Sequence, residues 1–133
     1  MPKINQLKYL SALNFALKLH SKQMRKDTQI PYFFHLSSVS NHVIENGGNT
    51  DEAVAGLLHD AVEDQGGEKT HKLIKKKFGN KVAKIVEDCT DTKVVPKPPW
   101  FERKKQYLSD LKKKPQSSLL VSICDKTHNA SCI

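Results

Sequence analysis

Two pairs of polar residues within six positions carry the most chemistry in this chain. His59-Asp60 and Glu63-Asp64 follow the apolar run Ala55–Leu58, and buried charged groups are costly unless a metal or a charged ligand collects them. In a helix, the period of 3.6 residues brings His59 near Glu63, and Asp60 near both acids that follow it. That face would suit a divalent cation and an activated water. A solvated amphipathic helix with an acidic face is the alternative.

Two further residues could supply metal ligands. His35 lies in the apolar segment PYFFHL, and Asp125 follows the largely apolar run LLVSIC. His35 could instead be a core histidine with one hydrogen-bonded nitrogen, and Asp125 could pair with a nearby basic residue. With His59 and Asp60, however, they offer two imidazoles and two carboxylates, a set that neutralises a dication and leaves octahedral positions for water and substrate. The sequence has no Cys-x-x-Cys pair, which argues against a closed structural zinc site.

The order of these motifs resembles that of the HD-superfamily metal phosphohydrolases. More narrowly, the chain is similar to the hydrolase domain of the RelA/SpoT proteins and to their single-domain relatives, the small alarmone hydrolases. The resemblance covers nearly the whole chain and rests on matching segments: Lys18-Leu19-His20 with Gln23, Arg25-Lys26, Pro31-Tyr32 with His35, LLHDAVED at 57–64, Phe78-Gly79, 86–91, 97–104 and 125–129.

This resemblance implies a metal site, an acidic pair and residues that bind a nucleotide. It implies one manganese ion with four ligands: His35, His59, Asp60 and Asp125. It implies that Glu63 and Asp64 orient or deprotonate the attacking water and assist proton transfer to the leaving side. It implies a nucleotide pocket in which basic residues flank the purine base or meet phosphates and an amide contacts the sugar: Arg25 and Lys26 (base), Lys93, Lys97 and Arg103 (phosphates), and Asn129 (sugar).

The substrates that the resemblance implies are guanosine tetra- and pentaphosphate, hydrolysed at the ribose 3′ position with release of pyrophosphate. One alternative is the same chemistry on another phosphoester, such as the 2′-phosphate of NADPH. Another is a catalytically weak nucleotide-binding or regulatory module. A pure binding module has no need of a water-activating pair, so the presence of Glu63 and Asp64 favours the enzyme.

Composition agrees with an anionic nucleotide as the partner. The chain has 22 Lys and Arg against 14 Asp and Glu, a formal net charge of +8. Nucleic acid is the usual competitor for a basic chain, but no recognition motif occurs and only 7% of residues are aromatic. No apolar stretch approaches the roughly 20 residues of a membrane span, and the N-terminus lacks a signal-type segment. Three cysteines without framework spacing predict reduced thiols and a cytoplasmic location. A homo-oligomer is left open.

Apolar residues at helical spacing predict an all-α helix bundle, and the resemblance implies that this bundle is an HD domain. We expect helices at 4–22, 36–45, 50–64, 69–78, 80–90, 100–113 and 116–130. Trp100 is expected to be a packing anchor, with a position near the substrate as the alternative. The 133 residues are expected to form a single domain, 1–133, that lacks the C-terminal helix or helices of longer relatives. His128 is expected to be structural, because it follows Asp125 too closely along the helix to share its direction.

Overall fold

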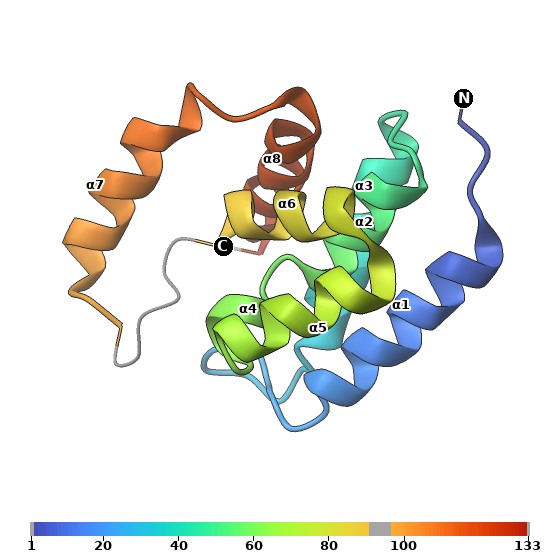
Figure 1. Ribbon diagram of the computed structural model, residues 1–133. Coiled ribbons are helices and arrows are strands. Elements are labelled where there is room, and N and C mark those ends of the chain that lie inside the picture. Colours follow the sequence, from blue (N-terminus) through green and yellow to red (C-terminus); the bar gives the residue numbers. More distant parts are fainter. Residues whose placement is uncertain (1, 91–96, 133) are drawn as a thin grey trace.

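The computed structural model describes residues 2–90 and 97–132, which form an all-α bundle (Figure 1). Eight helices occur in these ranges: α1 (Gln6–Leu19), α2 (Phe33–Glu45), α3 (Thr50–Leu58), α4 (Ala61–Asp64), α5 (Glu68–Phe78), α6 (Asn80–Cys89), α7 (Trp100–Leu111) and α8 (Gln116–Ser131). Most of the predicted helices are confirmed to within a few residues. The prediction of one continuous helix over 50–64 is wrong, because the chain breaks between α3 and α4.

Helix α3 lies at the centre of the bundle and packs against α1, α2, α6 and α8. Its sequence explains this position, since the run 53–58 contains no polar side chain and every residue of it is buried. The start of the helix is fixed by a reciprocal capping box between Asn49 and Glu52, with hydrogen bonds of 2.9 and 2.8 Å. The core helix thus carries His59 at its C-terminal end into the interior.

Close packing of α2 on α3 depends on Gly56. A Cβ atom at this position would lie 3.1 Å from the Cα atom of Ser40, closer than normal contact. Ser40 cannot easily move away, because it is buried and its hydroxyl donates to the carbonyl of Ala53 at 2.7 Å. The glycine therefore sets the distance between the helix that carries His35 and the helix that leads into His59.

Substitution of Gly56 by alanine is expected to lower the free energy of unfolding by about 1 kcal/mol. Overpacking costs about 1–3 kcal/mol, and the better helix propensity of alanine offsets about 1 kcal/mol of that. Urea unfolding of the variant measures the difference, with the exposed Lys72→Ala on α5 as control. A Gly56→Ala variant as stable as the control would show that the two helices move apart without penalty.

Helix α7 stands apart from the rest of the bundle (Figure 1) and buries none of its residues. Trp100 is 64% exposed, so its expected role as a packing anchor is wrong. The helix contacts the bundle through Tyr107, whose ring lies 5.1 Å from the ammonium of Lys126 on α8, and through Arg103, which approaches Glu63 at 4.0 Å. Its apolar side and the neighbouring face of α8 line an open groove of about 600 Å³.

Among the described residues, no helix has the combination of length and hydropathy needed to cross a bilayer.

Candidate metal centre

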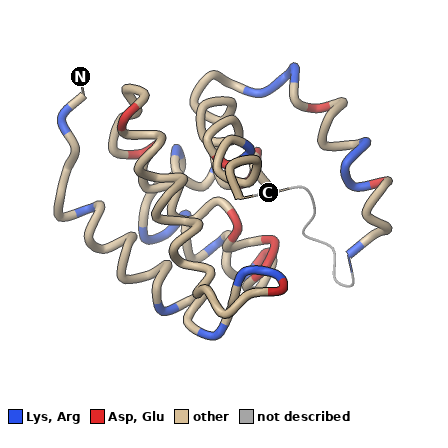
Figure 2. Tube along the Cα trace, turned by 180° about the vertical axis from the view of Figure 1, so that it is seen from behind, with Lys and Arg blue, Asp and Glu red and all other residues tan. Residues whose placement is uncertain are grey.

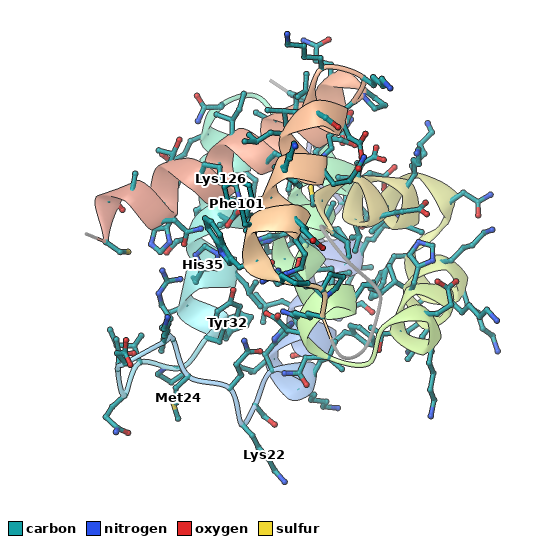
Figure 3. All side chains as sticks on the ribbon, turned by 90° about the vertical axis from the view of Figure 1, so that its left-hand side faces the viewer. Lys22, Met24, Tyr32, His35, Phe101 and Lys126 are labelled. Atoms are coloured by element: carbon teal, nitrogen blue, oxygen red, sulfur yellow. The ribbon has the colours of Figure 1, made fainter. Side chains whose placement is uncertain are left out.

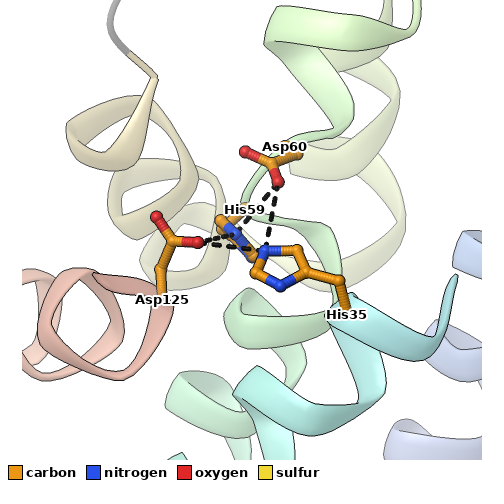
Figure 4. A group of neighbouring side chains, drawn as sticks. All are labelled: His35, His59, Asp60 and Asp125. Carbon is orange, nitrogen blue, oxygen red and sulfur yellow. Dashed lines mark hydrogen bonds and ion pairs between the residues drawn. The ribbon is translucent and has the colours of Figure 1, made fainter. Parts of the chain in front are cut away.

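Four potential ligand atoms converge from three parts of the fold (Figure 4). His35 comes from α2, Asp125 from α8, and His59 and Asp60 from the turn between α3 and α4. Asp125 Oδ1 lies 3.0 Å from His35 Nε2 and 3.2 Å from His59 Nε2. Asp60 Oδ2 lies 3.1 Å from His59 Nε2 and 3.8 Å from His35 Nε2. All four atoms are within 4.8 Å of one another.

The break between α3 and α4 allows adjacent residues to face the same point. In a continuous helix, successive side chains point about 100° apart. Here α3 ends at Leu58, and Asp60 has φ −101° and ψ 0°, outside the helical range. The same break places Glu63 and Asp64 on the short helix α4, beside the four-residue cluster rather than within it. The expectation that one helical face carries all four polar residues is therefore wrong.

The cluster suits a divalent cation in both charge and size. Two neutral imidazoles and two carboxylates balance a charge of +2 and match the nitrogen and oxygen ligands of such ions. With metal–ligand bonds of about 2.1–2.4 Å, ligands on opposite sides of an ion are about 4.2–4.8 Å apart. The observed span of 4.8 Å agrees with that range.

Contacts behind the cluster orient its side chains. His59 Nδ1 lies 2.7 Å from the carbonyl of Gly56, so Nδ1 carries the proton and Nε2 faces the other ligand atoms. The Tyr32 hydroxyl donates to Asp60 Oδ2 at 2.5 Å. His35 Nδ1 lies 2.8 Å from Nδ1 of His128. The expectation that His128 points away from the site is wrong, because residues three apart share a helix face.

The pKa values of three residues in the cluster are strongly shifted. Burial opposes ionisation of Asp60, but the neighbouring His59 imidazolium and its hydrogen bond lower the Asp60 pKa to about 2. Burial likewise opposes ionisation of Asp125, whose pKa is nevertheless lowered by hydrogen bonds from His35 and His59. Burial disfavours the charged form of His59, yet the two aspartates raise its pKa well above the usual 6.5. Without a metal, His59 is therefore the counter-ion of the aspartates.

These shifts predict the pH dependence of the metal-free chain. The raised His59 pKa gives stability that is fully present below 6.5 and is lost as the pH rises through the folded-state pKa. The lowered Asp60 pKa gives stability that is present above 3.8 and is lost as the pH falls towards about 2. We expect urea unfolding with a chelator to show greatest stability between these limits. A His59→Gln variant should lose the alkaline decline, and stability that rises steadily above pH 6.5 would contradict the assignment.

The two acids of α4 lie among basic side chains. The Lys97 ammonium is 3.3 Å from Glu63 Oε2 and 3.4 Å from Asp64 Oδ1, and Arg103 approaches the same Glu63 oxygen at 4.0 Å. Burial disfavours charge on Lys97, but Glu63 and Asp64 raise its pKa, so it stays cationic. Two of the residues expected to meet phosphates are thus brought to the acids expected to handle protons.

The residues expected to hold the base and sugar are only partly brought together. The Arg25 guanidinium donates to Asn129 Oδ1 at 3.2 Å, and the Asn129 amide donates to Asp125 Oδ1 at the same distance. Lys26 is exposed on the loop after α1. Lys93 lies outside the described residues. Arg25 and Asn129 therefore mark one side of the cluster.

A polar pocket of about 170 Å³ opens over the cluster and includes side chains that the sequence analysis did not assign to it. Tyr32, Lys104, Tyr107 and Lys126 line it together with Asp60 and Asp125. Figure 3 shows Tyr32, His35, Phe101 and Lys126 on the same side of the molecule. The signal that could have found Tyr32 was its place three residues before His35, which puts both at the start of one helix.

An HD domain family model matches residues 12–133, and the chain therefore belongs to the HD domain family. Among curated proteins, it is similar to guanosine-3′,5′-bis(diphosphate) 3′-pyrophosphohydrolase MESH1. Identity is 41% for the protein of Xenopus tropicalis and 36% for that of Homo sapiens, over 123 residues in each case. These matches cover 90% of this chain, which spans 66% of the length of each relative.

A solved structure is also similar, that of a metazoan ortholog of SpoT described as hydrolysing ppGpp and playing a role in starvation responses. The superposition gives a TM-score of 0.82 at 30% identity and covers 92% of this chain and 67% of the other. At this level of similarity the arrangement of the helices is shared, and the all-α HD-domain fold expected from the sequence is confirmed.

Proposed function

We propose that this chain hydrolyses guanosine 3′,5′-bis(diphosphate) and related nucleotides at the ribose 3′ position, releasing pyrophosphate with the help of one manganese ion. The observation that carries the proposal is the convergence of four ligand atoms within 4.8 Å, directly beside the acidic pair of α4. The substrate is proposed from the activity for which the curated relatives are named. The three cysteines are free, in agreement with a cytoplasmic location.

The metal would be held by His35 and His59 through Nε2 and by Asp60 and Asp125 through one carboxylate oxygen each. When bound, a divalent ion lowers the pKa of a coordinated water towards about 7 and offsets phosphate charge. The protein contributes the orientation of the ligands. The Gly56 carbonyl fixes the His59 tautomer, and the Tyr32 hydroxyl fixes one oxygen of Asp60.

Glu63 and Asp64 would carry the protons. Hydrolysis joins a water oxygen to the phosphorus on the ribose O3′ atom and breaks the bond between that phosphorus and O3′. One proton must leave the water and one must reach O3′, and an ionised carboxylate is suited to accept the first. The ammonium of Lys97 contacts both carboxylates. The two carboxylates share these two proton transfers.

The remaining basic residues would place the substrate. Lys97 and Arg103 lie next to Glu63, where phosphates of a bound nucleotide can replace the carboxylate as their partner. Lys93 is proposed for the same role. Arg25 and Lys26 would flank the base, and Asn129 would contact the sugar. The surplus of positive charge is spread over several helices (Figure 2) and favours encounter with a polyanionic nucleotide.

The test is pyrophosphate release from guanosine tetraphosphate by the purified chain, with manganese and with a chelator. We expect turnover with manganese and none with the chelator. The product formed besides pyrophosphate should be guanosine 5′-diphosphate. A parallel panel contains guanosine pentaphosphate, NADPH and a short single-stranded RNA. Release of inorganic phosphate from NADPH without action on the guanosine nucleotides would replace the proposed substrate, and no turnover of any compound with manganese bound would reject the enzyme.

A further inference from the structure

A second network reaches Asp64 from the side opposite to its basic neighbours. Gln23, in the loop after α1, donates through its side-chain nitrogen to Asp64 Oδ2 at 3.2 Å. Its side-chain oxygen receives the Gln65 amide at 2.9 Å and lies 2.8 Å from Nδ1 of His20. His20 is 1% exposed, and its ring stacks on Tyr32 at a centroid distance of 5.6 Å. No hydrogen bond or ion pair joins His20 or Gln23 to the four residues of the cluster.

The chemistry of the groups fixes every orientation in this network. An ionised carboxylate only accepts hydrogen bonds, so the Gln23 atom that faces Asp64 must be the NH₂ group. The Gln23 oxygen must then face His20 and Gln65, and it can only accept. His20 therefore carries its proton on Nδ1. Burial lowers the pKa of His20, which keeps the ring neutral. Its Nε2 has no partner among the described residues.

We propose that Gln23 is a positioning residue for Asp64, and that His20 acts through Gln23 by locking the direction of its amide. The proposal rests on the proposed function, in which Asp64 handles a proton. One Asp64 oxygen is held by Gln23, while the other lies 3.4 Å from Lys97. The carboxylate is thus fixed in its plane from both sides. Gln23 and His20 do not touch the substrate in this assignment.

Three variants separate this role from a structural one. Gln23→Leu keeps the side-chain size but removes both functions of the amide. His20→Phe keeps a ring to stack on Tyr32 but removes the Nδ1 donor. Lys22→Ala is the matched control, since Lys22 is exposed in the same loop. Each variant is compared with the native chain by circular dichroism, manganese titration and steady-state kinetics on guanosine tetraphosphate.

The expected result is a lower kcat with an unchanged KM. Gln23→Leu should lower kcat by about 10–100-fold, the usual effect of losing an orienting partner. KM and manganese affinity should stay within about twofold of native, because substrate and metal are held by other residues. His20→Phe should lower kcat less. If His20 acts only through Gln23, the double variant falls no further than Gln23→Leu. Native kcat in Gln23→Leu, or a parallel loss of manganese affinity, would overturn the proposal.

A spectroscopic readout keeps the assignment testable without turnover. Imidazole ¹⁵N–¹H spectra of the native chain should show His20 as the neutral form protonated at Nδ1, and this signal should change in Gln23→Leu but not in Lys22→Ala. A His20 ring protonated at Nε2 alone would overturn the network, even if Gln23→Leu fails to fold. If the native chain hydrolyses no nucleotide, the proposed function fails, and the spectra still decide whether Gln23 is oriented towards Asp64.

Discussion

Replacement of Asp125 by asparagine is expected to abolish manganese-dependent turnover and to weaken manganese binding more than about 100-fold. Mutation of a residue that only hydrogen-bonds to a metal ligand usually lowers metal affinity or activity by about 10–100-fold. Asp125 belongs to the cluster itself, so a larger effect is expected. Its Oδ1 atom is within 3.2 Å of both imidazoles, and the other carboxylate of the cluster, that of Asp60, is already assigned to the ion. Asparagine preserves the shape but removes the charge that balances the cation.

Calorimetric titration with manganese, followed by kinetics at saturating metal, measures both effects of this variant. Asp110→Asn on α7 is the matched control, since it makes the same chemical change outside the cluster and should behave like the native chain. Native manganese affinity in Asp125→Asn would show that the cluster is not the metal site. Unchanged affinity with lost turnover would place Asp125 in the chemical step instead.

Replacement of Glu63 by glutamine is expected to lower turnover without weakening manganese binding. Turnover should fall by about 10²–10⁴-fold, the usual contribution of a general acid or base. Manganese affinity should be retained, because Glu63 lies beside the cluster rather than in it. The glutamine still fills the space next to Lys97 and Arg103, so the fold of the pocket should be preserved.

The measurement is kcat at saturating manganese and substrate, with the exposed Glu45→Gln as control. If Glu63→Gln binds manganese as weakly as Asp125→Asn, Glu63 is a ligand and the division between the cluster and the acidic pair is wrong. If kcat is native, Asp64 alone carries the protons. Together, Asp125→Asn and Glu63→Gln therefore distinguish residues that bind the metal from residues that transfer protons.

The helical architecture could be predicted closely from sequence, because local patterns determine it. The uniformly apolar run before His59 predicts a central helix, and α3 is the most buried element of the bundle. The glycine pair after α2 predicts its end, and Gly47 indeed has a φ of +86°. The start of α2 at Phe33 rather than Leu36 was not predicted, since aromatic residues after a proline carry no distinct helix signal.

The break between α3 and α4 could not be predicted from periodicity. The segment 57–64 continues a helical pattern without glycine or proline, and nothing local marks a turn at His59. The cause is tertiary, since Asp60 contacts Tyr32 and Asp125 contacts His59 only in the folded chain. A pattern-based analysis finds which residues gather but not how the chain bends to gather them.

Contacts between side chains far apart in the sequence could not be predicted either. The pairing of His128 with His35 joins residues 93 positions apart, and that of Gln23 with Asp64 joins residues 41 apart. The spacing of His128 and Asp125 did contain a usable signal, because residues three apart lie on one helix face. No sequence signal predicted the exposure of Trp100, because an aromatic residue at a helix start is consistent with either burial or exposure.

The isolation of α7 has an evolutionary consequence. A helix that buries no residue is under little selection from folding, since exposed substitutions usually change stability by less than about 0.5 kcal/mol. The same helix nevertheless contributes Lys104 and Tyr107 to the pocket above the cluster. Mutations along α7 can therefore alter which molecules the pocket admits, while the four-residue cluster, which comes from other parts of the fold, stays intact. Specificity in such a chain can diverge faster than chemistry.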